Sequence, residues 1–203
     1  LHYPLRRQRQ MCIRDRINRL SIGLQSPDDR ELKILGRIHN YEQFLETYRS
    51  AREAGFDNIN IDLMSAIPDQ TYEGWIHNLR TVAGLDPEHI SAYSLIIEEG
   101  TPFASRTLNL PDEDAEYNMY EATAQILREY GFEQYEISNY AKKGRECRHN
   151  VGYWIRQDYL GFGLGASSLY GKERFANTQD MKKYLENSRT PEKISCLLYT
   201  SDA

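Results

Sequence analysis

The chain has 203 residues, 27% of them charged, and a formal net charge of −5 at pH 7. This length is sufficient for one domain with a buried core, and the acidic balance argues against nucleic acid as the main partner. The mean hydropathy is −0.70, and no apolar run reaches the roughly 20 residues of a membrane-spanning helix, so we expect no integral membrane segment.

The two ends of the chain lack the patterning of a folded domain. Residues 1–16 are basic and irregular, without the apolar core and small-residue cleavage site of a targeting peptide. A nucleic-acid-binding arm is the alternative there, but Met11–Arg16 and Ser195–Ala203 resemble translated sequencing adaptor. We therefore interpret residues 1–16 and 194–203 as non-native segments and expect the natural protein to extend further at both ends.

Cys147 is the only cysteine outside these two segments, since the others are Cys12 and Cys196. One thiol cannot form an internal disulfide framework, so we expect a reducing, cytoplasmic environment. One thiol also cannot bind an iron–sulfur cluster, which is held by several thiolates. The histidines show no metal-ligand spacing, and we predict no metal site in this chain.

The first predicted strand covers residues 20–25. Ser26 is a plausible N-cap for a short helix over 27–35. Asn40 starts a second helix, because Gln43 stands where a capping box requires it. The apolar face of this second helix carries Tyr41, Phe44, Tyr48 and Ala51, and Gly55 marks its end.

Two further strands are predicted over residues 58–64 and 90–97. Between them Thr71 starts a helix whose apolar face includes Trp75 and Leu79. Strands and helices that alternate at this spacing predict parallel strands with right-handed crossovers. We therefore expect an α/β fold, either an open doubly wound sheet or a barrel.

The alternation stops after Pro102. A helix is predicted over 112–130, because its acidic first turn favours the positive end of the helix dipole. A strand over 132–140 and a last helix over 177–185 follow. No repeat or low-complexity linker separates the two halves, so we expect one compact unit.

Three residues lie at or near the carboxyl ends of the predicted parallel strands, where such folds bind ligands. They are Gln25, Asp62 and Ile96. An amide and a carboxylate that converge there suit a polar, cationic ligand. The alternatives are a helix-start hydrogen bond for Gln25 and a loop cap for Asp62.

The segment Cys147–Trp154 combines a thiol, an imidazole, a carboxamide and two aromatic rings. Imidazole and thiolate are the usual protein ligands of haem iron, while Tyr153 and Trp154 could cover a porphyrin. The alternative is that His149 and Asn150 cap a turn and the two aromatic side chains fill a core.

Glycines alternate just downstream, at positions 161, 163 and 165. In an extended strand all three would lie on one face. A face without side chains allows a flat ligand or another backbone to approach closely.

Several motifs occur in a specific order. They are Cys-Arg-His-Asn-x-x-Tyr-Trp over 147–154 and the segments 18–26, 35–39, 60–64 and 96–102. Together, over residues 17–185, they resemble the HemW-type haem chaperones, radical-SAM proteins related to oxygen-independent coproporphyrinogen III oxidase. The family's Cys-x-x-x-Cys-x-x-Cys cluster motif, expected before Asn18, is absent, so the resemblance implies that this chain is a fragment.

The resemblance implies the C-terminal part of a radical-SAM partial (β/α) barrel, with its last three βα units in residues 17–103. It implies an appended α+β region, typical of this family, in residues 104–193. Positions that match the family's S-adenosylmethionine contacts are Gln25, Arg37, Asp62 and Ile96. A lone arginine such as Arg37 is otherwise a solvated surface cation, although Gly36 would let the chain turn and direct Arg37 inward.

The function implied by the resemblance is to bind haem and transfer it to an acceptor protein. The intact protein would also hold S-adenosylmethionine and a [4Fe-4S] cluster, and His149, Asn150, Tyr153 and Trp154 would form the haem site. The main alternative is oxidative decarboxylation of coproporphyrinogen III, although the true oxidases lack the 147–154 element in this form. A non-radical barrel enzyme is a third reading. We expect no catalysis from a chain without the cluster cysteines.

Overall fold

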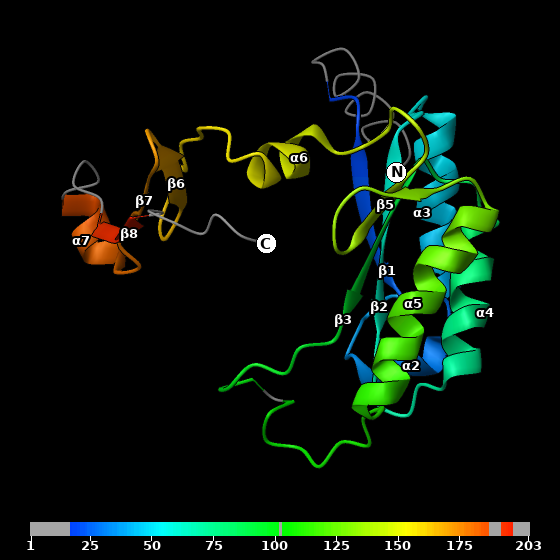
Figure 1. The fold of residues 1–203 in the computed structure, drawn as a ribbon. Coiled ribbons are helices and arrows are strands. Elements are labelled where there is room, and N and C mark those ends of the chain that lie inside the picture. The colour runs from blue at the N-terminus through cyan, green and yellow to red at the C-terminus, as the bar shows by residue number, and fades with distance from the viewer. Residues whose placement is uncertain (1–16, 102, 187–191, 197–203) are drawn as a thin grey trace, which may run out of the picture. The chain divides into compact units, whose positions relative to one another are not determined.

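Parallel strands form the centre of the first part of the chain (Figure 1). The computed structural model describes residues 17–101 and 103–186, and the backbone alone of 192–196. The interpretation of residues 1–16 and 197–203 as non-native, and the Pro102 end of one motif, lie outside the described residues.

The chain divides into two compact units, Leu1–Glu146 and Cys147–Ala203. The expectation of one compact unit was therefore wrong. The division falls after Glu146, whereas the sequence suggested a change of architecture after residue 103. The assignment of residues 104–193 to a family-specific region stays a prediction.

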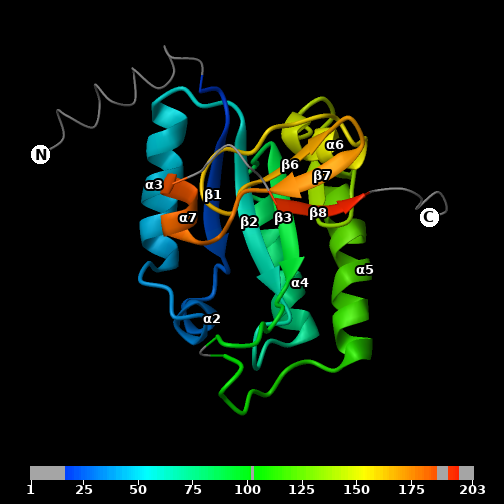
Figure 2. The same ribbon diagram turned by 90° about the vertical axis from the view of Figure 1, so that its left-hand side faces the viewer.

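In the described part of the first unit, a five-stranded sheet has the order β1-β2-β3-β5-β4. The strands are β1 (Leu20–Gln25), β2 (Ile59–Ser65), β3 (His89–Ser94), β4 (Glu133–Gln134) and β5 (Asn139–Ala141). The first three are parallel, while β5 pairs antiparallel with both β3 and β4. Figure 2 shows β1, β2 and β3 side by side. The predicted α/β fold with parallel strands is confirmed.

Helices α3 (Tyr41–Glu53), α4 (Tyr72–Ala83) and α5 (Glu113–Glu129) cover one face of this sheet (Figure 1). The N-terminus of α3 begins as predicted, because Asn40 and Gln43 form the expected capping box. Thr71 accepts from the Gly74 amide and Asp112 from the Ala115 amide. The core between helices and sheet includes Leu24, Phe44, Ile59, Ile61, Leu63, Trp75, Leu79, Val82, Ile90, Met119 and Leu127.

The short helix α2 (Asp29–Ile34) begins differently from the prediction. Its N-cap is Asp28, which accepts from the Arg30 amide at 2.8 Å, and not Ser26. The Ser26 hydroxyl donates instead to the buried carboxylate of Glu31, which also accepts from Gln70 Nε2 (3.0 Å) and Asn78 Nδ2 (2.8 Å). The Ser26 hydroxyl still accepts from the Asp28 amide at 2.9 Å, so Ser26 stabilises the turn that precedes α2 while Asp28 caps the helix.

The strand predicted over 132–140 is divided into β4 and β5. A tight turn separates them, in which the Tyr135 amide donates to the Asn139 carbonyl at 3.2 Å. The third parallel strand is shorter than predicted, because β3 ends at Ser94.

The second unit contains α6 (Arg148–Trp154), β6 (Ser167–Tyr170), β7 (Glu173–Ala176), α7 (Met181–Glu186) and β8 (Glu192–Cys196). Its strands form an antiparallel sheet in the order β6-β7-β8. The positive φ angles of Gly171 (57°) and Lys172 (72°) form the tight β6–β7 turn, as two-residue hairpins require. The described backbone of β8 extends to Cys196, into the segment interpreted as non-native.

The glycine-rich stretch 160–165 is a loop and not an extended strand. Gly163 and Gly165 have φ angles of 108° and 67°, which exclude an extended glycine face. The close approach of another backbone does occur at Gly161, where an added Cβ would lie 2.2 Å from the Ser167 carbonyl oxygen. Within the described ranges, no helix is long and apolar enough to cross a bilayer.

Candidate functional site

Gln25 and Asp62 meet over Gly23 on the sheet face opposite the helices. Gly23 is paired with Asp62 in the β1–β2 ladder, and a bulge follows before Gln25 pairs with Leu63. Gln25 has a positive φ of 73°. A Cβ added to Gly23 would lie 2.9 Å from Gln25 Nε2 and 3.9 Å from Asp62 Oδ2. The bulge therefore brings the amide and the carboxylate together above a position without a side chain.

The Asp62 carboxylate is half-buried and oriented by two neutral donors. Ser21 Oγ donates to Oδ2 at 3.0 Å, and Asn60 Nδ2 donates to Oδ1 at 2.7 Å. Strand alternation places these side chains on one face of the sheet. Because neither donor is charged, they orient the carboxylate without neutralising it.

Asn60 and Ser21 were not singled out from the sequence. The spacing of two between Asn60 and Asp62 would have placed both side chains on the same strand face. The network continues through His89, Ser91 and Asn139, which are buried on this same face. His89 and Ser91 lie on β3 and Asn139 lies on β5, far in the sequence from Asn60 on β2, so no local pattern predicts these contacts.

Arg37 follows helix α2 and Ile96 follows strand β3, and both side chains are exposed. Gly36 makes the predicted turn, with a φ of 69° and with the Arg37 amide donating to the Leu32 carbonyl at 2.9 Å. The Arg37 side chain is exposed, and its role as a ligand contact stays a prediction. Ile96 is 79% exposed and follows the end of β3.

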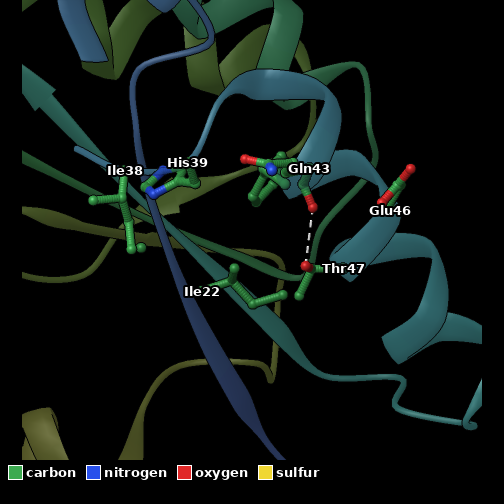
Figure 3. Close-up of a pocket in the computed structure, with 8 residues that line it drawn as sticks. Ile22, Ile38, His39, Gln43, Glu46 and Thr47 are labelled. Carbon is green, nitrogen blue, oxygen red and sulfur yellow. Dashed lines mark hydrogen bonds between the residues drawn. The ribbon is translucent and has the colours of Figure 1, made fainter. Parts of the chain in front are cut away.

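A cavity of about 480 Å³ lies between β1 and the start of α3. Figure 3 shows Ile22 on β1, with Ile38 and His39 before the helix. His39 Nε2 lies 3.2 Å from the Leu24 carbonyl oxygen, which fixes this segment against the strand. Gly23 also lines the cavity, so the cavity adjoins the position where Gln25 and Asp62 meet.

In the second unit, His149 and Tyr153 lie on one face of α6. Their ring centroids are 4.7 Å apart at 84°, and Tyr153 makes a similar contact with Tyr159. With Arg148 and others they line a cavity of about 220 Å³. This is smaller than the roughly 300–1,000 Å³ of pockets that enclose a drug-sized ligand. A large flat ligand would therefore lie against this cavity and not inside it.

Asn150 and Trp154 lie one residue further along α6, which turns them by about 100° from His149 and Tyr153. The structure therefore divides the four predicted haem residues between two neighbouring helix faces. Tyr153 and Trp154 are 45% and 55% exposed. The alternative that these two aromatic rings fill a core was wrong.

Among the described residues, no group of three histidine, cysteine or acidic side chains converges in a way that could hold a metal ion. Cys147 is the cysteine whose side chain is described, and it precedes α6. The described residues therefore do not fit a [4Fe-4S] cluster, and we derive no chemistry through one.

Comparison with known proteins shows what the chain resembles. Residues 12–82 match the model of the radical SAM superfamily. The chain is 41% identical over 174 residues to the heme chaperone HemW of Bacillus subtilis, covering 84% of this chain and 46% of that protein. It is 39% identical over 189 residues to the heme chaperone HemW of Escherichia coli, covering 87% and 49%.

A mouse protein, radical S-adenosyl methionine domain-containing protein 1, mitochondrial, is 42% identical over 158 residues, covering 76% of this chain and 36% of that protein. The structure of coproporphyrinogen III oxidase (HemN) from Escherichia coli, a radical SAM enzyme, matches with a TM-score of 0.78 and 22% identity, covering 95% of this chain and 49% of that chain. This last likeness shows the fold. The chain spans about half the length of the curated relatives it matches.

Proposed function

Because the chain belongs to the radical SAM superfamily, in the group that contains the HemW proteins, we propose that it is the part of a haem chaperone that helps to bind S-adenosylmethionine and carries the haem site. The observation that carries the cofactor part is the convergence of Gln25 and Asp62 over Gly23. The two proposed ligand sites belong to different units.

The group around Gly23 fits S-adenosylmethionine. The cofactor has an amino group and ribose hydroxyls, for which an oriented carboxylate and an amide are suitable partners. The missing side chain of Gly23 leaves space that a Cβ would fill. Arg37, which follows α2, and Ile96, which follows β3, remain proposed contacts, since an exposed side chain can still contact a ligand.

The α6 helix supports haem binding through His149. Its imidazole is exposed and can bind iron through a ring nitrogen. Arg148 lines the same cavity and suits a haem carboxylate. We propose that Tyr153 contacts the porphyrin beside His149 and that Asn150 and Trp154 contact it from the adjacent helix face.

An exposed site also supports transfer. Haem bound against the surface of a short helix is accessible to an acceptor protein without unfolding of the carrier. We therefore propose an acceptor protein as the second partner. The scarcity of cysteines favours a reducing compartment such as the cytoplasm for this activity.

Coproporphyrinogen III oxidation is the second candidate. Its support is the TM-score of 0.78 to HemN, which concerns the fold, whereas the HemW relatives share 32–42% sequence identity with this chain. The exposed His149 and Tyr153 pair favours haem binding over the oxidase activity.

The cofactor part is tested by titrating S-adenosylmethionine into the intact, cluster-loaded protein that carries this sequence. Asp62→Ala should lower the affinity by about 1–3 kcal/mol, since a contact with a charged group is lost. Asp57→Asn is the matched control, because this exposed carboxylate precedes the opposite end of β2. Wild-type affinity in a folded Asp62→Ala variant would contradict the proposed contact.

A further inference from the structure

A chain of buried hydrogen bonds leads from Asp62 into the sheet. Asn60 is 2% exposed and stands at its centre. Its Nδ2 donates to Asp62 Oδ1 and to Ser21 Oγ, both at 2.7 Å. Its Oδ1 lies 2.6 Å from His89 Nδ1 and 3.0 Å from Ser91 Oγ, whose single proton has a closer acceptor in Asn139 Oδ1, at 2.6 Å. Both polar atoms of the Asn60 amide therefore have hydrogen-bond partners.

We propose that His89 and Asn60 form a positioning relay that fixes the Asp62 carboxylate, with His89 carrying its proton on Nδ1. This inference rests on the proposed role of Asp62 as a ligand contact. Neither His89 nor Asn60 touches the ligand in this account, because His89 acts through Asn60 and Asn60 acts through Asp62.

The orientation of the Asn60 amide follows from Asp62. An ionised carboxylate only accepts hydrogen bonds, so the NH₂ group of Asn60 must face it. The carbonyl oxygen then faces His89, and a carbonyl oxygen only accepts. His89 Nδ1 must therefore carry a proton and donate it to Asn60.

The other ring nitrogen of His89 has a complementary partner. His89 is fully buried, and burial, together with the nearby charge of Arg19, lowers the pKa of its imidazole to about 3. The ring is therefore neutral near pH 7, and Nε2 keeps its lone pair. The Tyr135 hydroxyl lies 2.8 Å away and donates to it.

The relay matters because the side-chain amide of an asparagine can flip, which exchanges the positions of its NH₂ group and its carbonyl oxygen. Without the His89 donor, only the Ser91 hydroxyl would favour the Asn60 carbonyl oxygen on that side, and this hydroxyl has a closer acceptor in Asn139 Oδ1, at 2.6 Å. A reversed amide would place this oxygen against the Asp62 carboxylate, and the two acceptors would repel each other. Asp62 would then lose its fixed position, although the helix-covered face of the sheet would be unaffected.

Nitrogen-15 NMR of the histidine rings in the 203-residue chain tests the arrangement directly. We expect His89 to show a protonated Nδ1 and an unprotonated Nε2 at pH 7. A ring protonated on Nε2 alone, or on both nitrogens, would overturn the proposal.

Substitution tests the effect on the ligand in the intact, cluster-loaded protein. His89→Phe keeps a ring of similar size but removes the donor, and should lower S-adenosylmethionine affinity about tenfold, roughly the loss of one hydrogen bond. His89→Asn should recover most of the affinity, because an asparagine Nδ2 can take the place of the imidazole Nδ1. A purely structural role would show no such recovery at equal thermal stability.

Two further variants separate this inference from the proposed function. Tyr135→Phe removes only the hydroxyl beyond His89 and should fold even if His89→Phe does not, with a weaker loss of affinity. A loss in Asp62→Ala without any loss in folded His89→Phe and Tyr135→Phe would overturn the relay alone. Wild-type affinity in Asp62→Ala would overturn the proposed contact, and the tautomer measurement would then decide the arrangement of the relay.

Discussion

Gly23 and Asp62 are direct partners in the parallel ladder between β1 and β2. The Asp62 carboxylate approaches within 3.9 Å of the place where a Gly23 side chain would begin, and the Gln25 amide within 2.9 Å. The glycine is therefore required for space and not for an unusual backbone angle, since its φ is not positive. This makes Gly23 a sensitive position at which to test the site.

Gly23→Ala should leave the fold intact while weakening cofactor binding. The new methyl group would press on Nε2 of Gln25, the far end of a flexible side chain that can move away. We expect a stability change within about 1 kcal/mol and an affinity for S-adenosylmethionine lowered about tenfold, as for one lost hydrogen bond. Calorimetric titration of the intact protein measures the affinity, and a urea melt measures the stability.

A double variant shows whether Gly23→Ala acts through Gln25. In a Gln25→Ala background the methyl group meets no amide, so it should cause little further loss. Fully additive losses in the double variant would contradict this explanation.

His89 should make the stability of the first unit depend on pH. Its pKa is about 3 in the folded protein and about 6.5 in the unfolded chain. Between these values the unfolded state binds a proton that the folded state does not, so stability falls as the pH decreases from about 6.5 towards 3. Above pH 6.5 this contribution is complete and constant.

Urea unfolding at pH 6 and pH 4 measures this effect. Wild-type protein should lose up to about 1.4 kcal/mol per pH unit more than His89→Phe, which has no titrating group at this position. His77→Ala is the control, because His77 is exposed on α4 and should keep the wild-type slope. Equal slopes in wild type and His89→Phe would show that His89 is not buried as a neutral ring.

Gly161→Ala should destabilise the second unit. Its methyl group would lie 2.2 Å from the Ser167 carbonyl oxygen, which is part of β6 and cannot move as a flexible side chain can. We expect a loss of about 1–3 kcal/mol, as for other overpacked positions, with the first unit unchanged. Amide hydrogen exchange, measured separately for the amides of each unit, distinguishes the stability of the second unit from that of the first.

The neighbouring Phe162→Ala is the matched control for Gly161→Ala. Phe162 is 87% exposed, so removing its ring should change stability by less than about 0.5 kcal/mol. A larger loss in Phe162→Ala than in Gly161→Ala would contradict the close backbone approach.

Local signals predicted the starts of α3, α4 and α5. Asn40 with Gln43 and Thr71 begin helices as expected, because each cap depends on residues within one turn, while Asp112, predicted in the first turn, is the N-cap of α5. Ser26 is not the cap because the helix starts two residues later than predicted, so that its oxygen accepts from the Asp28 amide and Asp28 caps α2. The 132–140 strand failed because the chain folds back on itself at Tyr135.

The sequence predicted some features of the candidate sites and not others. It predicted that Gln25 and Asp62 converge near the strand ends, and in the structure both side chains lie close to Gly23. The His89 contact with Asn60 joins residues on different strands and could not follow from strand periodicity. For α6, the sequence identified the residues, but only the helical geometry shows that His149 and Tyr153 share one face while Asn150 and Trp154 lie on the next.

Haem titration of the 203-residue chain tests the central claim, a haem site at His149, most directly. Wild-type chain should bind haem with an absorbance band that His149→Ala shifts or abolishes, while thermal stability stays nearly constant because His149 is exposed. His77→Ala, an exposed helical histidine of the first unit, should retain the wild-type spectrum. A wild-type haem spectrum in His149→Ala, or a loss of stability without a spectral change, would contradict the account.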